Sequence, residues 1–450
     1  MKNNTKVIIG ILVVLVVVVG IWFTVGQRPP IEDPVAEDPV AEDPVAEDPV
    51  AEVELAGEIT HWVWGDYEER GAVDFPLYFP NIKVNYVFVP ADEYTTKLMS
   101  TIASGAEMPD VVNLEMTPRG MLVNMDVWER LDAEPYNLDK SLLVPFSIPL
   151  ISNERGEIVS VQIDNTVGGY AFDRALAKEF FGTDDPTELE NIFPSLNEIV
   201  SRGKEVSQKS NGEIFMFSGV GDAFSAISGL FTSEPLVLDG KLNLEPTFLE
   251  TYEIIAELIA NRSIGPYTQW TPAWNASFTS ERVIFYAAPS WFMTFVIEPN
   301  DRESVGRWGL MTPPGGGFSW GGTAYAIPKN ARQENKMLAW TYIEWFTMSM
   351  EGTRSFVREH ATPTLFLPAI GTDIYAPNPD PFYGGQDIMS KLLDISDHPN
   401  TRTRPMTRYD QAIMDANEII LHELAQGLSA EDAMEKLRAE IISRVPELAD

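Results

Sequence analysis

Aromatic and acidic side chains follow several of the strands that the sequence predicts. The strand at 58–64 ends at Trp64 and is followed by Asp66, and the strand at 111–114 leads directly into Glu115. In open α/β sheets, ligands bind beyond the carboxyl ends of the strands, so side chains at these positions are candidates for contact with a ligand. From strand ends and predicted loops, the candidate ligand-binding residues are Trp64, Asp66, Asp110, Glu115, Asp164, Asp222, Trp274, Trp291, Trp320, Gly321 and Gly322.

This mixture of residue types suits a sugar. A pyranose has an apolar C–H face that stacks on tryptophan and a rim of hydroxyl groups that donate to carboxylates. Gly321 and Gly322 would let backbone N–H groups reach a hydroxyl, with a plain turn as the alternative. Each tryptophan could equally belong to the core, and Asp110, which precedes a strand, could cap a turn. The residues therefore favour a carbohydrate ligand and leave a structural role open at each position.

Several classes of chemistry lack the residues that they require. The chain of 450 residues has no Cys, only four His, no G-x-x-x-x-G-K-[ST] phosphate loop and no G-x-S-x-G elbow. A net charge of -35 would repel the phosphates of a nucleic acid. We therefore expect no catalytic residues, no cofactor, no metal site and no nucleic-acid partner. A glycosidase stays open as the enzyme alternative, because it needs only two suitably spaced carboxylates.

Alternating strand and helix patterns must position these side chains. Strand patterns at 58–64 and 82–89 precede a helix in which Tyr94, Leu98 and Ile102 share one face. The same alternation recurs through the middle of the chain, and the tail from 408 to 445 reads as helical. Because there are enough strand–helix units for two sheets, the sequence predicts an α/β fold with two lobes.

An apolar segment precedes this body. Residues 7–25 are uncharged and would span roughly 28 Å as a helix, close to the thickness of a bilayer's hydrocarbon core. We expect residues 1–6 to be cytoplasmic and residues 7–26 to form an uncleaved single-pass membrane anchor, since Lys2 and Lys6 precede the segment and acids follow it. A cleaved signal peptide is the alternative. Both interpretations place the body outside the cytoplasm.

The segment at 27–56 contains Glu-Asp-Pro-Val-Ala four times, over residues 32–51. Recurrent proline and self-repelling acids prevent such a segment from burying a core and keep it extended. We expect a disordered acidic linker that separates the body from the membrane.

Four blocks in order resemble the carbohydrate-type extracellular solute-binding proteins of ABC importers, family 1. The first, YFPNIKVNYVFVPADEYTTKLMSTIASGAEMPDVVNLE at 78–115, carries that family's P-x-I-x-V strand, its A-S-G helix end and its P-D-V. The later blocks include GGYAFDRALAKEFFG at 168–182, FTSERVIFYAAPSWF at 278–292 and LMTPPGGGFSWGGTAYAIPKNARQENKMLAWTYIEWF at 310–346. The sequence departs from the family at Ser280-Glu281-Arg282, where a small-Gly-Lys turn is usual, and it has no lipobox cysteine.

The resemblance implies a two-lobed, periplasmic-binding-protein-like fold of type II. Lobe one would comprise 57–162 plus 305–362, and lobe two would comprise 163–304 plus 363–450. A mono- or oligosaccharide would bind between the lobes and be delivered to ABC permease subunits served by a separate ATPase, and we expect a monomer. The alternatives are a receptor for another polar solute, such as a polyol phosphate or an opine-like compound, and a sensor-associated receptor.

Overall fold

The computed structural model of the protein describes residues 55–231 and 234–449. These residues lie in a single unit, Glu54–Asp450. The membrane helix expected at 7–26 falls outside the described residues, as does the linker expected at 27–56 except for its last two residues. Within the described ranges, no helix is long and apolar enough to cross a membrane.

The first sheet contains two kinds of strand. In some, buried side chains alternate with more exposed ones, and others are buried along almost their whole length. Its strand β1 (Gly57–Val63) pairs in parallel with β2 (Ile82–Phe88) and with β3 (Val111–Glu115). The strand β12 (Thr323–Ala326) runs antiparallel to β3 and to β4 (Val161–Gln162). The order across the sheet is β2-β1-β3-β12-β4, so a segment far along the chain completes a sheet that begins at the first described strand.

The second sheet is centred on β5 (Val167–Asp173), in which every residue is buried. β5 pairs antiparallel with β9 (Val283–Pro289) and β10 (Trp308–Met311), and also with the short β11 (Phe318–Ser319). β6 (Phe215–Phe217) adds a parallel strand on the far side of β9. Continuous burial of β5 and β9 explains their uninterrupted apolar sequences.

Helices cover both sheets, and several begin at side chains that cap them. Ser195 accepts a hydrogen bond from the backbone N–H of Glu198 and so caps α8 (Leu196–Ser210), an arrangement worth about 1 kcal/mol. The other helices, and a separate β-hairpin, are α1 (Tyr67–Gly71), α2 (Phe75–Tyr78), α3 (Ala91–Ser104), α4 (Met116–Val123), α5 (Ile148–Ile151), α6 (Arg174–Phe181), α7 (Pro186–Ile192), α9 (Val220–Ser228), α10 (Glu245–Ala260), α11 (Pro272–Ser277), α12 (Ser290–Phe292), α13 (Glu298–Asn300), α14 (Lys336–Met348), α15 (Met350–His360), α16 (Ile388–Asp397), α17 (Asp410–Leu424), α18 (Ala430–Arg444), β7 (Val237–Leu238) and β8 (Lys241–Leu242).

The chain passes from the first sheet to the second between β4 and β5, and returns between β11 and β12. The expected division at residue 305 assigned β10 and β11 to lobe one, but both strands pair with β5 in the second sheet. Strands of this length carry the same apolar pattern in either sheet, so the pattern could not show which partner they take. The predicted α/β architecture with two lobes is confirmed.

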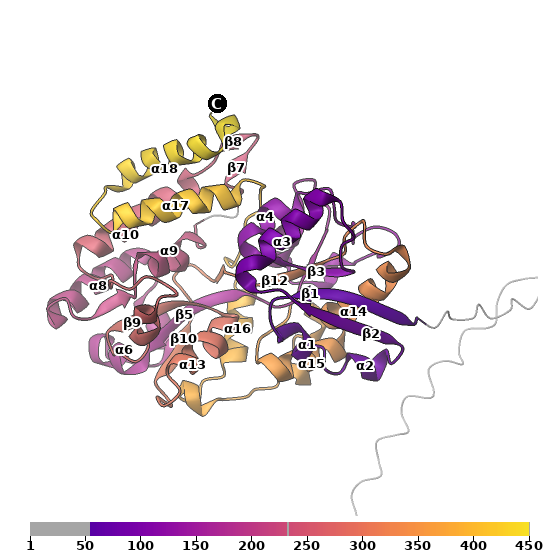
Figure 1. Ribbon diagram of the computed structural model, residues 1–450. Helices are drawn as coiled ribbons and strands as arrows, with labels where there is room; N and C mark the ends of the chain where they lie inside the picture. The colour runs from indigo at the N-terminus through magenta and orange to yellow at the C-terminus, as the bar shows by residue number, and fades with distance from the viewer. Residues whose placement is uncertain (1–54, 232–233, 450) are drawn as a thin grey trace, which may run out of the picture. The chain divides into compact units, whose positions relative to one another are not determined.

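The last part of the chain packs on the second lobe. The helical tail expected at 408–445 is confirmed as α17 and α18, which lie beside α10 (Figure 1). α17 also contacts α4 of the first lobe and α9 of the second, so it borders the space between the sheets.

Candidate functional site

Strand ends of both sheets meet around a cavity of about 580 Å³, which we call the aromatic cavity. It is lined by Trp64, Tyr67, Ala91, Tyr94, Thr95, Glu115, Thr117, Asp164, Trp291, Phe295, Gly321, Gly322 and Thr323. Six of the eleven candidate residues are among them, so about half of the candidates lie around one cavity. Cavities of this size accommodate small-molecule ligands.

The first lobe contributes two aromatic rings that are fixed by neighbouring rings. Trp64, directly after β1, meets the ring of Tyr94 in α3 edge-on, with ring centroids 4.9 Å apart and planes at 84°. Tyr67 in α1 stacks on His360, with centroids 3.8 Å apart and planes at 30°. Because these contacts hold the rings in place, a ligand would meet a surface that needs little reorganisation.

The second lobe contributes Trp291, in the short helix α12 that follows β9. Its indole Nε1 donates a hydrogen bond to the backbone carbonyl of Trp320, at 3.1 Å. Its ring is nearly parallel to that of Trp270, at 20° with centroids 6.2 Å apart, and Trp270 is 57% exposed. The polar edge of Trp291 is therefore occupied within the protein, and its ring is available for stacking.

Asp164 lies in the segment that joins β4 to β5 and is 4% exposed. Its Oδ1 has no hydrogen-bond partner among the described residues. Burial raises the pKa of its carboxyl to about 6, and the nearby Arg119 guanidinium opposes that rise. Leaving a buried acceptor unpaired costs free energy, so a donor supplied by a ligand would be bound favourably at this atom.

Glu115 reaches the same cavity from the end of β3, but part of its carboxylate has a structural role. Its side chain is the N-cap of α4, and Oε2 accepts a hydrogen bond from the backbone N–H of Thr117 at 2.8 Å. A carboxylate has lone pairs for further bonds, so capping is compatible with contact to a ligand.

Gly321 and Gly322 form the strip of backbone between β11 and β12 that borders the cavity. Both have left-handed conformations, with φ of 79° and 92°. A Cβ at Gly321 would lie 2.8 Å from Nε1 of Trp291, and one at Gly322 would lie 2.5 Å from Cγ2 of Thr166. These positions therefore require glycine for two reasons, conformation and close packing.

Three of the candidate carboxylates do not reach the aromatic cavity. The side chain of Asp66 is 75% exposed and lies 4.0 Å from Arg70. Asp110 is buried and pairs with Arg332 at 2.6 Å. Asp222 is buried in α9 beneath the second sheet, where its Oδ1 lies within hydrogen-bonding distance of the backbone N–H of residue 287, at 3.4 Å.

Two of the candidate tryptophans also lie elsewhere. Trp274 is completely buried, and its Nε1 donates to Oγ of Ser218 at 3.1 Å. α11 turns this ring into the apolar core, although the loop that precedes it is at the surface. Trp320 lines a second cavity and helps to place Trp291 through its carbonyl and its ring, whose centroid lies 5.5 Å from that of Trp291.

The strand-end rule missed three aromatic residues that line the aromatic cavity: Tyr67, Tyr94 and Phe295. Tyr94 shares an apolar helix face with Leu98, and this periodicity predicted a core position. Tyr67 and Phe295 lie within a few residues of Trp64 and Trp291, so extending the search beyond each strand end would have found them.

A family model for bacterial extracellular solute-binding proteins matches residues 74–370. No curated protein matches the chain. Among solved structures, an extracellular solute-binding protein of family 1 superposes with a TM-score of 0.77 at 17% identity, covering 86% of this chain and 99% of that one.

Two further similar structures are sugar-binding proteins by their descriptions. The galacto-N-biose-/lacto-N-biose I-binding protein of the ABC transporter from Bifidobacterium longum, in complex with lacto-N-biose, has a TM-score of 0.68 at 16% identity, covering 88% and 98% of the two chains. The sugar-binding protein MalE from Xanthomonas citri has a TM-score of 0.68 at 16% identity, with coverage of 87% and 98%. At these identities the likeness shows a shared fold.

Proposed function

The chain belongs to the family of bacterial extracellular solute-binding proteins, and we propose that its solute is a carbohydrate, mono- or oligosaccharide, which it delivers to an ABC permease. The observation that carries the proposal is the combination in one cavity of two aromatic rings and a buried carboxylate oxygen. Trp64 and Trp291 line the cavity, and Asp164 Oδ1 has no donor within the part of the chain that the structure describes. Two of the structural neighbours are sugar-binding proteins by name.

The chemistry of the cavity matches that of a sugar ring. The apolar C–H face would stack on an indole, and a hydroxyl on the rim would donate to Asp164 Oδ1. Each contact uses a group that the fold leaves available, since the Nε1 of Trp291 is already bonded and the Oδ1 of Asp164 is not. Stacking alone would accept any flat apolar ligand, so the carboxylate supplies the selectivity for a hydroxylated one.

The proposal includes a cellular context. The globular part would be extracytoplasmic and monomeric, held at the cell membrane by a single N-terminal span. It would work with permease subunits and a separate ATPase and would catalyse no reaction itself. Closure of the two lobes over the ligand would bend the segments 163–166 and 320–322, where the chain passes between the sheets.

Titration of tryptophan fluorescence tests the proposal. Mono- and oligosaccharides, polyols, amino acids and peptides are added to the full chain, and we expect a saturable change with a set of related sugars. The same change should be absent in Trp291→Ala. Saturation by another solute class and by no sugar would contradict the carbohydrate assignment. Hydrolysis of aryl glycosides or oligosaccharides during the incubation would indicate a glycosidase instead.

A further inference from the structure

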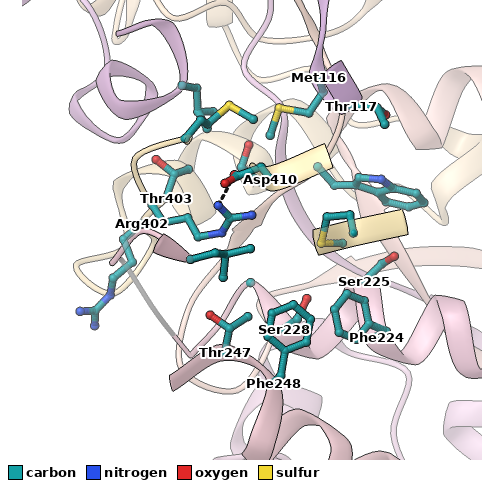
Figure 2. Close-up of a pocket in the computed structure, with 18 residues that line it drawn as sticks. Met116, Thr117, Phe224, Ser225, Ser228, Thr247, Phe248, Arg402, Thr403 and Asp410 are labelled. Atoms are coloured by element: carbon teal, nitrogen blue, oxygen red, sulfur yellow. Dashed lines mark hydrogen bonds and ion pairs between the residues drawn. The ribbon is translucent and has the colours of Figure 1, made fainter. Parts of the chain in front are cut away.

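Figure 2 shows a second cavity, of about 270 Å³, which shares a lining residue with the aromatic cavity. We call it the methionine cavity; it is lined by Met116, Thr117, Leu150, Phe224, Ser225, Ser228, Gly229, Leu236, Thr247, Phe248, Ser319, Trp320, Arg402, Thr403, Arg404, Met406, Asp410 and Met414. Thr117 lines both cavities, and Trp320 and Gly321, adjacent in sequence, line one each. A ligand long enough to pass Thr117 would therefore extend from one cavity into the other.

The wall of the methionine cavity is chiefly apolar. Phe224 of α9 and Phe248 of α10 stack on each other, with ring centroids 5.8 Å apart and planes at 27°. Met116 of α4 and Met414 of α17 are half-buried and line the same cavity. Figure 2 shows Met116 on the opposite side of the cavity from Phe224 and Phe248. Methionine side chains are flexible and polarizable, so they adapt to apolar groups of different shapes.

Most polar groups in the wall are already bonded within the protein. Arg404 forms an ion pair with Asp410, whose other carboxylate oxygen accepts from Thr407. The hydroxyl of Ser225 donates to the Gly221 carbonyl at 3.0 Å. Because these groups already bond within the protein, a polar ligand would have to compete with those bonds.

Thr247 contributes a buried polar atom to this wall. Thr247 is 6% exposed, and its Oγ1 has no hydrogen-bond partner among the described residues. Figure 2 shows it beside Phe248 at the base of the cavity. A buried unpaired hydroxyl in a chiefly apolar wall suits a mostly apolar group that also carries a polar atom.

We propose that the natural ligand is a glycoside with an apolar aglycone, whose sugar occupies the aromatic cavity and whose aglycone occupies the methionine cavity. This inference rests on the proposed carbohydrate function and specifies its substrate class. The two cavities divide the ligand by chemistry: stacking rings and a carboxylate contact the sugar, while aliphatic, aromatic and thioether groups enclose the aglycone.

Calorimetric titration of the full chain with matched glycosides tests the inference. For each of several sugars, the methyl glycoside is compared with the phenyl glycoside of the same anomer. We expect the phenyl compound of the recognised sugar to bind at least about tenfold more tightly, because its ring leaves water for an apolar wall. Phenol alone should not bind measurably.

Two variants locate the aglycone. Met414→Glu places a charge in the wall, and Met116→Gln alters the wall from the other lobe; each should reduce the phenyl advantage to below about threefold while the methyl glycoside keeps its affinity. The matched control is Met434→Glu, at a half-buried methionine of α18 outside the cavity lining, which should keep the full advantage. Met116→Gln also covers the case in which Met414→Glu does not fold.

The outcomes separate the two claims. Equal affinity of methyl and phenyl glycosides in the unaltered protein would overturn the inference and leave the proposed function intact. An advantage that survives in the folded cavity variants would place the aglycone elsewhere and would also overturn it, as would binding of phenol alone. Failure of every glycoside and free sugar to bind would instead refute the proposed function.

Discussion

At the scale of single residues, Asp164 has the strongest physical case for contact with a ligand. It is buried in the segment between the sheets, and its Oδ1 has no partner among the described residues. Burial raises its pKa from 3.8 to about 6 in the folded state. Because the folded state binds the proton more tightly, this group stabilises the fold most at low pH, and that contribution is lost as the pH rises from about 4 through about 6.

Ligand binding should have the opposite pH dependence. A sugar hydroxyl that donates to Oδ1 favours the ionised carboxylate, so affinity should fall as the pH decreases from about 7.5 to 5 through the pKa near 6. Asp164→Asn should bind more weakly at pH 7.5 and should lose most of this dependence. Arg119 and Glu68 both interact electrostatically with Asp164, and burial raises the pKa of Glu68 to about 7. Any pH dependence of affinity that remains in Asp164→Asn therefore comes from groups such as these. Calorimetry across this range measures both proteins, and an unchanged pH profile in Asp164→Asn would exclude the contact.

The two tryptophans Trp291 and Trp274 should respond differently to truncation. Trp291→Ala removes a half-buried ring that lines the aromatic cavity, so it should weaken sugar binding by at least about tenfold with little change in the melting temperature. Trp274→Ala removes a fully buried ring and should lower the free energy of unfolding by about 3–5 kcal/mol. Chemical denaturation and titration of each variant give both quantities. If Trp291→Ala lost stability as Trp274→Ala does, Trp291 would be a core residue.

At the scale of elements, the connections between strands determine the site. The turn between β11 and β12 contains two left-handed glycines, of which Gly321 lies against the indole of Trp291 and Gly322 against Thr166. The turn therefore positions the ring that would stack on the ligand, and a change in this backbone should alter affinity as well as stability.

Two glycine variants separate conformation from packing. Gly321 and Gly182 have similar φ angles, 79° and 86°, but a Cβ at Gly182 would meet nothing within 4 Å. Both Gly→Ala changes should cost about 1–2 kcal/mol of stability, because alanine is strained in the left-handed region. Only Gly321→Ala should also reduce sugar affinity, since its Cβ displaces Trp291. Thermal melting and titration compare the pair, and equal affinities would show that the turn does not position the ring.

The sequence was informative where function follows strand ends and uninformative where packing decides. Trp64, Glu115 and Trp291 line the aromatic cavity, and the sequence made them candidates because each follows a strand with a clear apolar pattern. Trp274 was misleading because a loop position does not reveal which way the next helix turns its side chain. Asp110 pairs with Arg332, more than 200 positions later, and no local pattern encodes such a partner. The pairing of β10 and β11 with β5 could not be predicted for the same reason, because no local pattern encodes a distant strand partner.

At the scale of the whole molecule, residues of both lobes line the aromatic cavity. Hinge closure should bring them together when the ligand binds. The chain has no Cys, so a pair introduced at Leu77 in α2 and Glu253 in α10, both exposed, can be labelled specifically. Distances between spin labels at these sites should shorten with a saturating sugar, and the same label pair in Trp291→Ala should need at least about tenfold more sugar for the same change. An unchanged distance in the sugar-bound protein would contradict closure.

The central claim is that a carbohydrate binds the folded protein, and a melting-temperature screen tests it most directly. The full chain is heated with mono- and oligosaccharides, polyols, amino acids and peptides in turn. A ligand that binds only the folded state stabilises it by about 2.7 kcal/mol at 100 times its dissociation constant, so it must raise the midpoint. We expect one related set of sugars or glycosides to do so and the other classes to have no effect. A rise with another solute class and with no sugar would contradict the account.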